Sequence, residues 1–240
     1  MSVRRKLAVA TLVCMGAAGL TACGNESDEP FEGQSADKVA EEAVKATRDA
    51  SSVRVKGTVR QEGARLRVDF HVDERDNCRG ALSARGARAD VVRSGRAMYV
   101  KGDETFWNNA LGDRPGSRQA VEKLRDRWVK SDPDRAGLRG VCDKQEFLAA
   151  LDSDKSERRG MRKSGTAEVE GKEAVVLEKE QPGGERLTLY VAAEGEPYIL
   201  KAVSKGGEAA GETVFTDYNE KVHAEKPPAG QVVEPAGPTR

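Results

Sequence analysis

The residues best able to carry chemistry in this chain are its cysteines and histidines, and both are scarce. The 240 residues include 4 Cys and 2 His. His71 and His223 lie far apart, and neither has a Cys or another His at the spacing that is usual for a metal site. The chain also contains no Gly-x-Ser-x-Gly elbow, no Gly-x-Gly-x-x-Gly and no phosphate-loop pattern. We therefore expect no metal, no cofactor and no conventional enzyme activity.

Carboxylates are plentiful and leave one enzymatic alternative open. Glu168 and Glu170 are separated by one residue, as are Asp152 and Asp154. Pairs of this kind along a strand or turn are typical of a solvated face. An enzyme with an unconventional carboxylate site is therefore a third hypothesis, behind the two developed below.

The N-terminal segment has the pattern of an export signal that ends at a cysteine. Three basic residues at 4–6 precede an apolar stretch at 7–20, which is short for a permanent membrane span and has the proportions of a secretory signal. It ends in Leu20-Thr21-Ala22-Cys23, which resembles the bacterial lipobox, where the cysteine thiol accepts a diacylglyceryl group before cleavage on its N-terminal side. We predict that residues 1–22 are a lipoprotein signal peptide and that Cys23 is lipidated. The alternative is an ordinary secretory signal with an incidental cysteine.

Lipidation at Cys23 would anchor the protein outside the cytoplasm without a spanning helix. Two or more acyl chains hold a protein stably at a membrane, whereas one chain binds reversibly. Residues 23–34 are polar and acidic and predict a flexible tether; residues 225–240 predict a Pro-rich disordered tail. A single domain is expected over 35–224. Nucleic acid is not an expected partner, because 40 Lys+Arg balance 40 Asp+Glu without clustering.

Two cysteines remain after export. Cys14 leaves with the signal peptide and Cys23 carries the lipid, so Cys78 and Cys142 are left in an oxidising compartment, which favours one disulfide. The alternative is two free thiols that serve a metal or catalysis.

Hydrophobic periodicity predicts an α+β protein. Residues 35–50 have helical spacing with Ser35 as a possible N-cap, and the period then changes to two through 53–72. Further short strands are expected to residue 101 and again after Gly165, with helices between 103 and 156, including one whose face would carry Val121, Leu124 and Trp128. The predicted fold is a strongly curved antiparallel sheet, an incomplete barrel of about 9–10 strands that covers a few helices.

The order of these features resembles actinobacterial envelope lipoproteins of the LppX/LprG type over about residues 35 to 228. The motifs that carry the resemblance, after the leader, the helix and the paired strands, are Arg96-Ala-Met-Tyr-Val-Lys-Gly102 with Phe106-Trp107, Arg127-Trp-Val129, Leu189-Tyr-Val-Ala192, Glu196-Pro-Tyr-Ile-Leu200, Phe215-Thr-Asp-Tyr-Asn219 and Lys226-Pro-Pro228. The resemblance implies a fold similar to the LolA/LolB carriers, with an apolar cavity between sheet and helices, and a role in binding and moving lipids. The chain departs from the family in being poor in aromatic residues, at 5%, and dense in Arg.

A lipid site of this kind needs a concave apolar wall that the protein's own helices leave partly unfilled. Inward-facing strand positions are the candidates: Val55, Leu66, Val68, Phe70, Met98, Val100, Leu189 and Leu200. The sequence therefore predicts a membrane-anchored extracytoplasmic lipoprotein that binds, and in the family carries, a lipid or other apolar ligand. Because a packed core has the same alternation, the alternative is a tethered interaction or sensing module with a filled core.

Overall fold

The structure is a computed structural model that describes residues 30–61, 64–133, 140, 142–152, 159–181, 183–206 and 210–234. The predicted signal peptide, the predicted lipidation site Cys23 and residues 23–29 of the predicted tether lie outside these described residues. The end of the tether is described: the Phe31 side chain packs against the core, and its carbonyl oxygen accepts a hydrogen bond from Lys163 Nζ at 2.6 Å.

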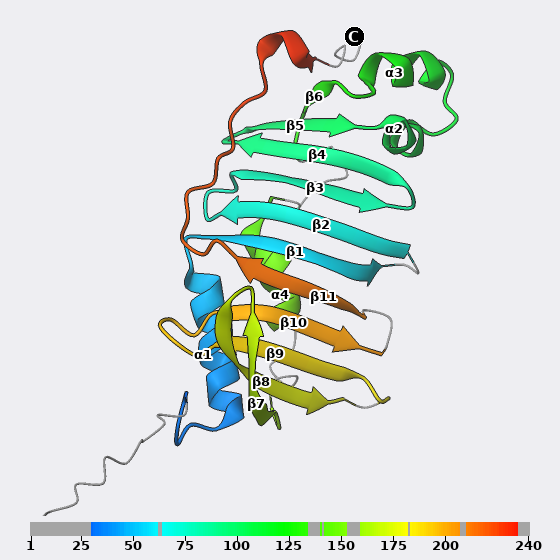
Figure 1. Cartoon of the computed structure of the whole chain (residues 1–240). Coiled ribbons are helices and arrows are strands. Elements are labelled where there is room, and N and C mark those ends of the chain that lie inside the picture. Colours follow the sequence, from blue (N-terminus) through cyan, green and yellow to red (C-terminus); the bar gives the residue numbers. More distant parts are fainter. Residues whose placement is uncertain are drawn as a thin grey trace, which may run out of the picture.

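Twelve strands are found within the described residues, and all belong to one sheet. They are β1 (Ser52–Gln61), β2 (Ala64–Asp73), β3 (Cys78–Ala84), β4 (Ala87–Ser94), β5 (Ala97–Gly102), β6 (Trp128–Ser131), β7 (Arg162–Val169), β8 (Lys172–Glu180), β9 (Arg186–Ala192), β10 (Ile199–Lys205), β11 (Gly211–Thr216) and β12 (Val232–Val233). Their order across the sheet is β12-β6-β5-β4-β3-β2-β1-β11-β10-β9-β8-β7. The sheet is curved and open (Figure 1), which confirms the predicted α+β class with a curved antiparallel sheet.

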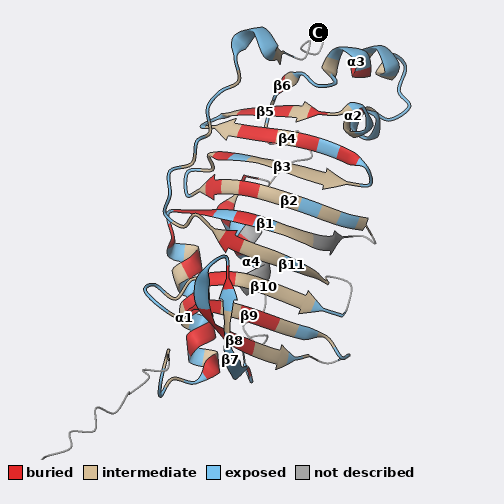
Figure 2. Cartoon of the chain, in the orientation of Figure 1, coloured by how far each residue is buried: buried red, intermediate tan, exposed pale blue. Residues whose placement is uncertain are grey.

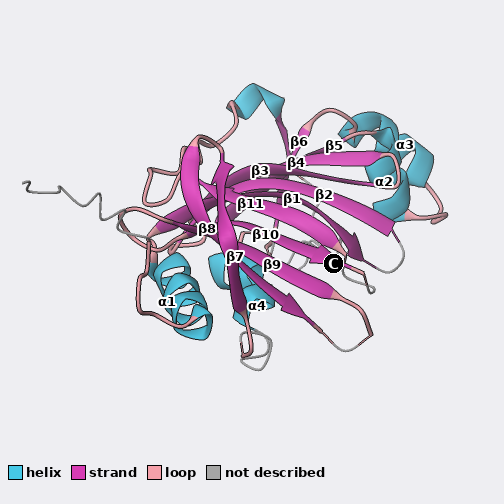
Figure 3. Cartoon of the chain, turned by 60° about the horizontal axis from the view of Figure 1, so that its bottom comes forward, coloured by secondary structure: helices cyan, strands magenta, loops and turns pink. Residues whose placement is uncertain are grey.

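Four α-helices accompany the sheet in the described residues: α1 (Ala36–Asp49), α2 (Glu104–Leu111), α3 (Ser117–Leu124) and α4 (Lys144–Asp152). Helices α1 and α4 lie on the same side of the sheet, whereas α2 and α3 lie at one end of β4 and β5 (Figures 1 and 3). We call the face that α1 and α4 cover the helix-side face, and the opposite one the open face.

Helix α1 forms where the sequence predicted it and packs through one apolar stripe (Figure 2). Its N-cap is Ser35, whose hydroxyl oxygen accepts a hydrogen bond from the Lys38 backbone N–H at 3.3 Å. Near its other end, Thr47 is fully buried, and its Oγ1 accepts a hydrogen bond from the Ile199 backbone N–H at 2.9 Å. This bond satisfies a buried donor at the start of β10 and fixes the helix on the sheet.

The core lies between α1, α4 and the helix-side face, as strict alternation along the strands requires. Val53 and Val55 on β1 stand opposite Val72 and Phe70 on β2, and all four are buried. Phe70 in turn stands opposite Gly80 on β3, and a Cβ at Gly80 would overlap its ring. The absence of a side chain at this position therefore lets the largest side chain of the row lie flat against the neighbouring strand.

The strand number exceeds the predicted 9–10 because two short strands lie outside the regions of clear alternation. Trp128 was expected on a helix face but begins β6, since α3 ends at Leu124 and the Asp126 N–H donates to the Gly102 carbonyl oxygen at 3.0 Å. Asp126 also has a positive φ of 57°, which turns the chain back toward β5. Within the expected tail, β12 pairs in parallel with β6, and residues 235–240 lie outside the described residues.

A second, smaller apolar cluster lies on the open face. The turn between β7 and β8 folds over this face, as Figure 3 shows. Its buried members are Val169, Ala174, Ala192 and Leu200, with Tyr190 and Val214 partly buried against them. The hairpin tip therefore borders the open face next to β10 and β11.

Candidate ligand-binding surfaces

The eight predicted wall residues do not form one surface. Val55, Phe70, Met98, Val100 and Leu189 belong to the main core, and each is at most 3% exposed. Leu66 and Val68 are partly exposed. Leu200 belongs to the second cluster, next to a register shift between Ile199 and Lys201, so its side chain lies on the open face. Five of the predicted positions are thus covered by the chain itself.

The partly exposed apolar side chains of the helix-side face form a margin beside this core. Alternation places Leu66, Val68, Leu82, Leu187 and Ala202 on that face, and all five are of intermediate exposure. Four of them, Val68, Leu82, Leu187 and Ala202, pack against buried core residues from their other side. We call these five residues the apolar margin.

Helix α2 brings two aromatic rings to the same side of the sheet. Its N-cap Asp103 accepts a hydrogen bond from the Phe106 N–H at 2.7 Å, and the rings of Phe106 and Trp107 meet edge to face at 5.1 Å. Both rings lie against Gly102 on β5. Gly102 pairs with Ala89 on β4, and Ala89 pairs with Leu82 on β3, so the rings lie two strands away from Leu82. The Trp107 indole Nε1 is buried without a hydrogen-bond partner among the described residues, so it is an unused donor near the margin.

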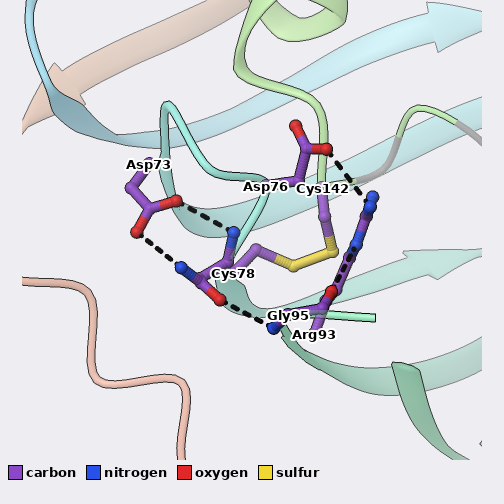
Figure 4. The surroundings of a disulfide bond; sticks show 7 residues. Asp73, Asp76, Cys78, Arg93, Gly95 and Cys142 are labelled. Atoms are coloured by element: carbon purple, nitrogen blue, oxygen red, sulfur yellow. Dashed lines mark hydrogen bonds and ion pairs between the residues drawn. A yellow bond between two sulfur atoms is a disulfide. The ribbon is translucent and has the colours of Figure 1, made fainter. Parts of the chain in front are cut away.

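A disulfide links the sheet to α4, as the cysteine arithmetic predicted. Cys78 at the start of β3 is bonded to Cys142, two residues before α4, with 5.3 Å between the Cα atoms. Both residues are buried. Around Cys78, Asn77 donates its backbone and side-chain N–H groups to Asp73 at 2.9 and 3.0 Å, and Asp76 pairs with Arg93 at 3.1 Å (Figure 4). These contacts hold the β2–β3 connection in place.

The open face has two adjoining hollows, which we call together the open-face groove. One has a volume of about 420 Å³ and is lined by residues including Arg54, His71, Arg79, Trp128 and His223. The other has a volume of about 610 Å³ and is lined by residues including Lys56, Thr58, Arg67, Ser83 and Glu170. They share Asp69, Ala81 and Arg88, so they form one continuous depression.

The groove has a polar floor bounded by two segments from elsewhere in the chain. The tip of the β7–β8 hairpin contributes Glu170. His223 belongs to the segment that leads from β11 to β12, which runs past the ends of the strands (Figure 1). Val68 also borders the groove through its strand, although its side chain packs on the helix side. Period-two alternation predicts that polar side chains share one face of these strands, but it does not predict a hollow on that face.

Metal-binding clusters and membrane-spanning helices are both absent from the described residues. No group of three or more His, Cys, Asp or Glu residues is arranged to hold a metal ion. None of the helices in this part of the chain has the length and apolar character needed to cross a bilayer.

Comparison with solved structures identifies the fold. LprF from Mycobacterium bovis superposes with a TM-score of 0.52 at 16% sequence identity, over 80% of this chain and 96% of LprF. The chain shares the fold of LprF. Lipoprotein LppX from Mycobacterium tuberculosis aligns over 79% of this chain and 97% of its own, at 16% identity and a TM-score of 0.47. The sequence matches no family model and no curated protein.

In the LprF fold as this chain adopts it, the two sides of the sheet have different chemistry. The helix-side face carries the core and the apolar margin, whereas the open face carries the charged groove. Any apolar ligand would therefore be expected on the first and any polar one on the second.

Proposed function

We propose that this protein is an extracytoplasmic lipoprotein that is anchored to the membrane through a lipidated Cys23 and binds a lipid or similar apolar ligand on the helix-side face of its sheet. The observation that carries the proposal is the apolar margin, Leu66, Val68, Leu82, Leu187 and Ala202, within a fold shared with LprF. These half-exposed apolar side chains adjoin the core in two groups, Leu66, Val68 and Leu82 on β2 and β3, and Leu187 and Ala202 on β9 and β10, with Gly57 and Thr213 between the groups. An acyl chain that lay across them would extend the apolar surface of the core.

The energetics favour a chain-like ligand at this place. Each methylene group moved out of water contributes about 0.8 kcal/mol, so an acyl chain that buries about ten of them would gain roughly 8 kcal/mol before the costs of association. A ligand on the margin would therefore be held mainly by the burial of its methylene groups.

A filled-core interaction or sensing module is the second candidate, and the burial of five predicted wall residues favours it. Val55, Phe70, Met98, Val100 and Leu189 are covered by the chain's own side chains. If the margin takes no ligand, the helix-side face is simply the core of a tethered domain, and function would lie on the open face.

The deciding experiment is organic extraction of the protein purified from its own envelope, followed by mass spectrometry. The proposal expects close to one lipid per chain in addition to the acyl groups on Cys23. Absence of stoichiometric lipid would leave the filled-core module.

Variants of neighbouring residues on β3 can locate the ligand. Leu82 faces the helix side and Ser83 the open face. A carboxylate beside an acyl chain is strongly unfavourable, so Leu82→Asp should reduce co-purified lipid about tenfold or more, while Ser83→Asp should leave it unchanged. Leu66→Asp, near the start of β2, is a second test should Leu82→Asp fail to give the native circular dichroism spectrum. Equal lipid content in all three variants would place the ligand elsewhere.

A further inference from the structure

A second surface, separate from the apolar margin, has the features of a polar binding site. We propose that the open-face groove binds an extended anionic glycan, a chain of sugars that carries a negative charge on successive units. The proposal concerns the face of the sheet that α1 and α4 do not cover, and it is independent of lipid binding.

Charge is the first argument. Lys56, Arg67 and Arg79 line the groove, are exposed, and have no ion-pair or hydrogen-bond partner among the described residues. The carboxylates of the groove floor are already engaged: Asp69 with Arg54 at 2.8 Å, Asp90 with Arg88 at 2.8 Å and Glu212 with Lys201 at 2.8 Å. Glu170 at the hairpin tip is the one lining carboxylate in the described residues without such a pair. The uncompensated charge of the groove is therefore positive.

Strand register shows that these three cations are spread along the groove and are not gathered at one point. They lie on the adjacent strands β1, β2 and β3, where Arg67 stands opposite Ser83 and Arg79 opposite His71. With about 3.4 Å per residue and about 4.8 Å between strands, the Cα atoms of Arg67 and Arg79 are roughly 14 Å apart, and those of Lys56 and Arg67 about 8 Å. A compact anion could meet Lys56 and Arg67 together, whereas a ligand with repeated charges could engage these two and Arg79 as well.

Sugar rings fit the remaining surface better than a polypeptide does. The half-buried indole of Trp128 lines the groove and offers a flat ring on which a sugar can stack. Arg54 and Arg88 are held by Asp69 and Asp90, so each pair presents guanidinium donors beside carboxylate acceptors, an arrangement that suits vicinal hydroxyls. Protein interfaces usually depend on apolar anchors in pockets, but the floor beside these cations carries the small side chains of Thr58, Ala81 and Ser83.

The test is a binding titration of the full-length protein with octagalacturonate, which has one carboxylate per sugar. Neutral maltooctaose and octaglutamate serve as comparison ligands of similar length. We expect octagalacturonate to bind at least about tenfold more tightly than either, with affinity falling as salt is raised. Binding should also protect one of the two tryptophans from acrylamide quenching, because Trp128 is half-exposed whereas Trp107 is only 8% exposed.

Charge reversal assigns the binding to the groove. The triple variant Lys56→Glu, Arg67→Glu, Arg79→Glu should weaken octagalacturonate binding about tenfold or more. A matched triple variant at exposed cations outside the groove, Arg96→Glu, Arg118→Glu, Lys205→Glu, carries the same change in net charge and should alter binding less than about twofold. Because the substituted side chains are exposed, both proteins should fold, which equal melting temperatures would verify.

Three results would overturn the proposal. The first is no binding of octagalacturonate, and the second is equal loss in both triple variants, which would indicate a general charge effect. The third is tighter binding of octaglutamate, which would make the groove a site for an acidic protein segment. None of these results would bear on the lipid proposal, because that proposal is tested by the lipid extracted from the protein and by the Leu82→Asp variant.

Discussion

His71 shows how a single polar residue on the open face responds to its surroundings. It lies on β2 at the floor of the groove, and its Nε2 is buried without a hydrogen-bond partner among the described residues. Burial lowers the pKa of His71 below its usual value of 6.5, and this outweighs the nearby carboxylates of Asp217 and Glu220, which act to raise it. The folded protein therefore disfavours the charged imidazolium.

The direction of this shift predicts a loss of stability in mild acid. Once the pH falls below about 6.5, the unfolded chain takes up a proton at His71 more readily than the folded chain does, so the free energy of unfolding decreases until the pH passes below the lowered pKa. Urea denaturation from pH 8 to pH 5 should show a smaller decrease for His71→Gln than for wild type. His223→Gln, at the exposed second histidine, is the control and should keep the wild-type slope. Identical slopes for wild type and His71→Gln would contradict the prediction.

Helix α4 is held by bonds from its N-terminal end to two other parts of the chain. The Lys144 ammonium donates hydrogen bonds to the carbonyl oxygens of Arg48, at 2.8 Å, and Ala50, at the C-terminal end of α1. Burial lowers the Lys144 pKa. The disulfide then ties the segment before α4 to β3. Helix α4 is thus attached to both α1 and the sheet at its N-terminal end.

The disulfide should contribute a large part of the stability of the domain. It closes a loop of 64 residues, and the chain-entropy model gives about 4 kcal/mol for such a loop. We expect the double variant Cys78→Ser, Cys142→Ser to lose about this amount in urea denaturation under oxidising conditions. Added reductant should lower the wild type to the level of the variant and leave the variant unchanged. If the free energy of unfolding of the wild type stayed the same once its disulfide had been fully reduced, the bond would add no stability.

The sequence predicted the elements whose signals are local. Alternation between 53 and 72 gave the β1–β2 pair, and the spacing after Ser35 gave α1. Trp128 was misassigned because its distance from Leu124 matches a helical turn, while the feature that ends the helix is a backbone bond from Asp126 to a distant strand. Strand β12 has two residues, which is too few for any periodicity.

The candidate site was predictable only in part, for a related reason. Alternation identifies which side chains share a face, and it placed Val55 and Phe70 correctly on the helix side. It cannot tell a filled interior from an open one, because that depends on helices packed from elsewhere in the chain. It failed at Leu200, where the irregular register between β9 and β10 changes the facing of the side chain. The groove was not predictable from local pattern, because it forms only when strands β1 to β4, the β7–β8 hairpin and the segment around His223 come together in the folded chain.

The point where the chain enters the domain would set how the protein lies at a membrane. Phe31 packs against the core, and its carbonyl oxygen is held by Lys163 on β7, so the predicted tether leaves the domain next to the β7 edge of the sheet. Helices α2 and α3 lie at the opposite end (Figure 1). A lipid on Cys23 would leave both faces of the sheet accessible within the envelope.

Membrane attachment itself should depend on one sulfur atom. If Cys23 carries the lipid, Cys23→Ser removes every acyl chain from the protein, and no helix in the described residues is long and apolar enough to cross a membrane in their place. The variant should therefore move from the membrane fraction to the culture medium or a soluble envelope fraction. Cys14→Ser is the matched control, because it changes a cysteine within the predicted leader and should leave the mature protein in the membrane. Mass spectrometry of the wild-type N-terminal peptide should find the diacylglyceryl group on Cys23. Retention of Cys23→Ser in the membrane would mean that the leader is not cleaved or that another contact holds the protein, and the proposed anchor would be lost.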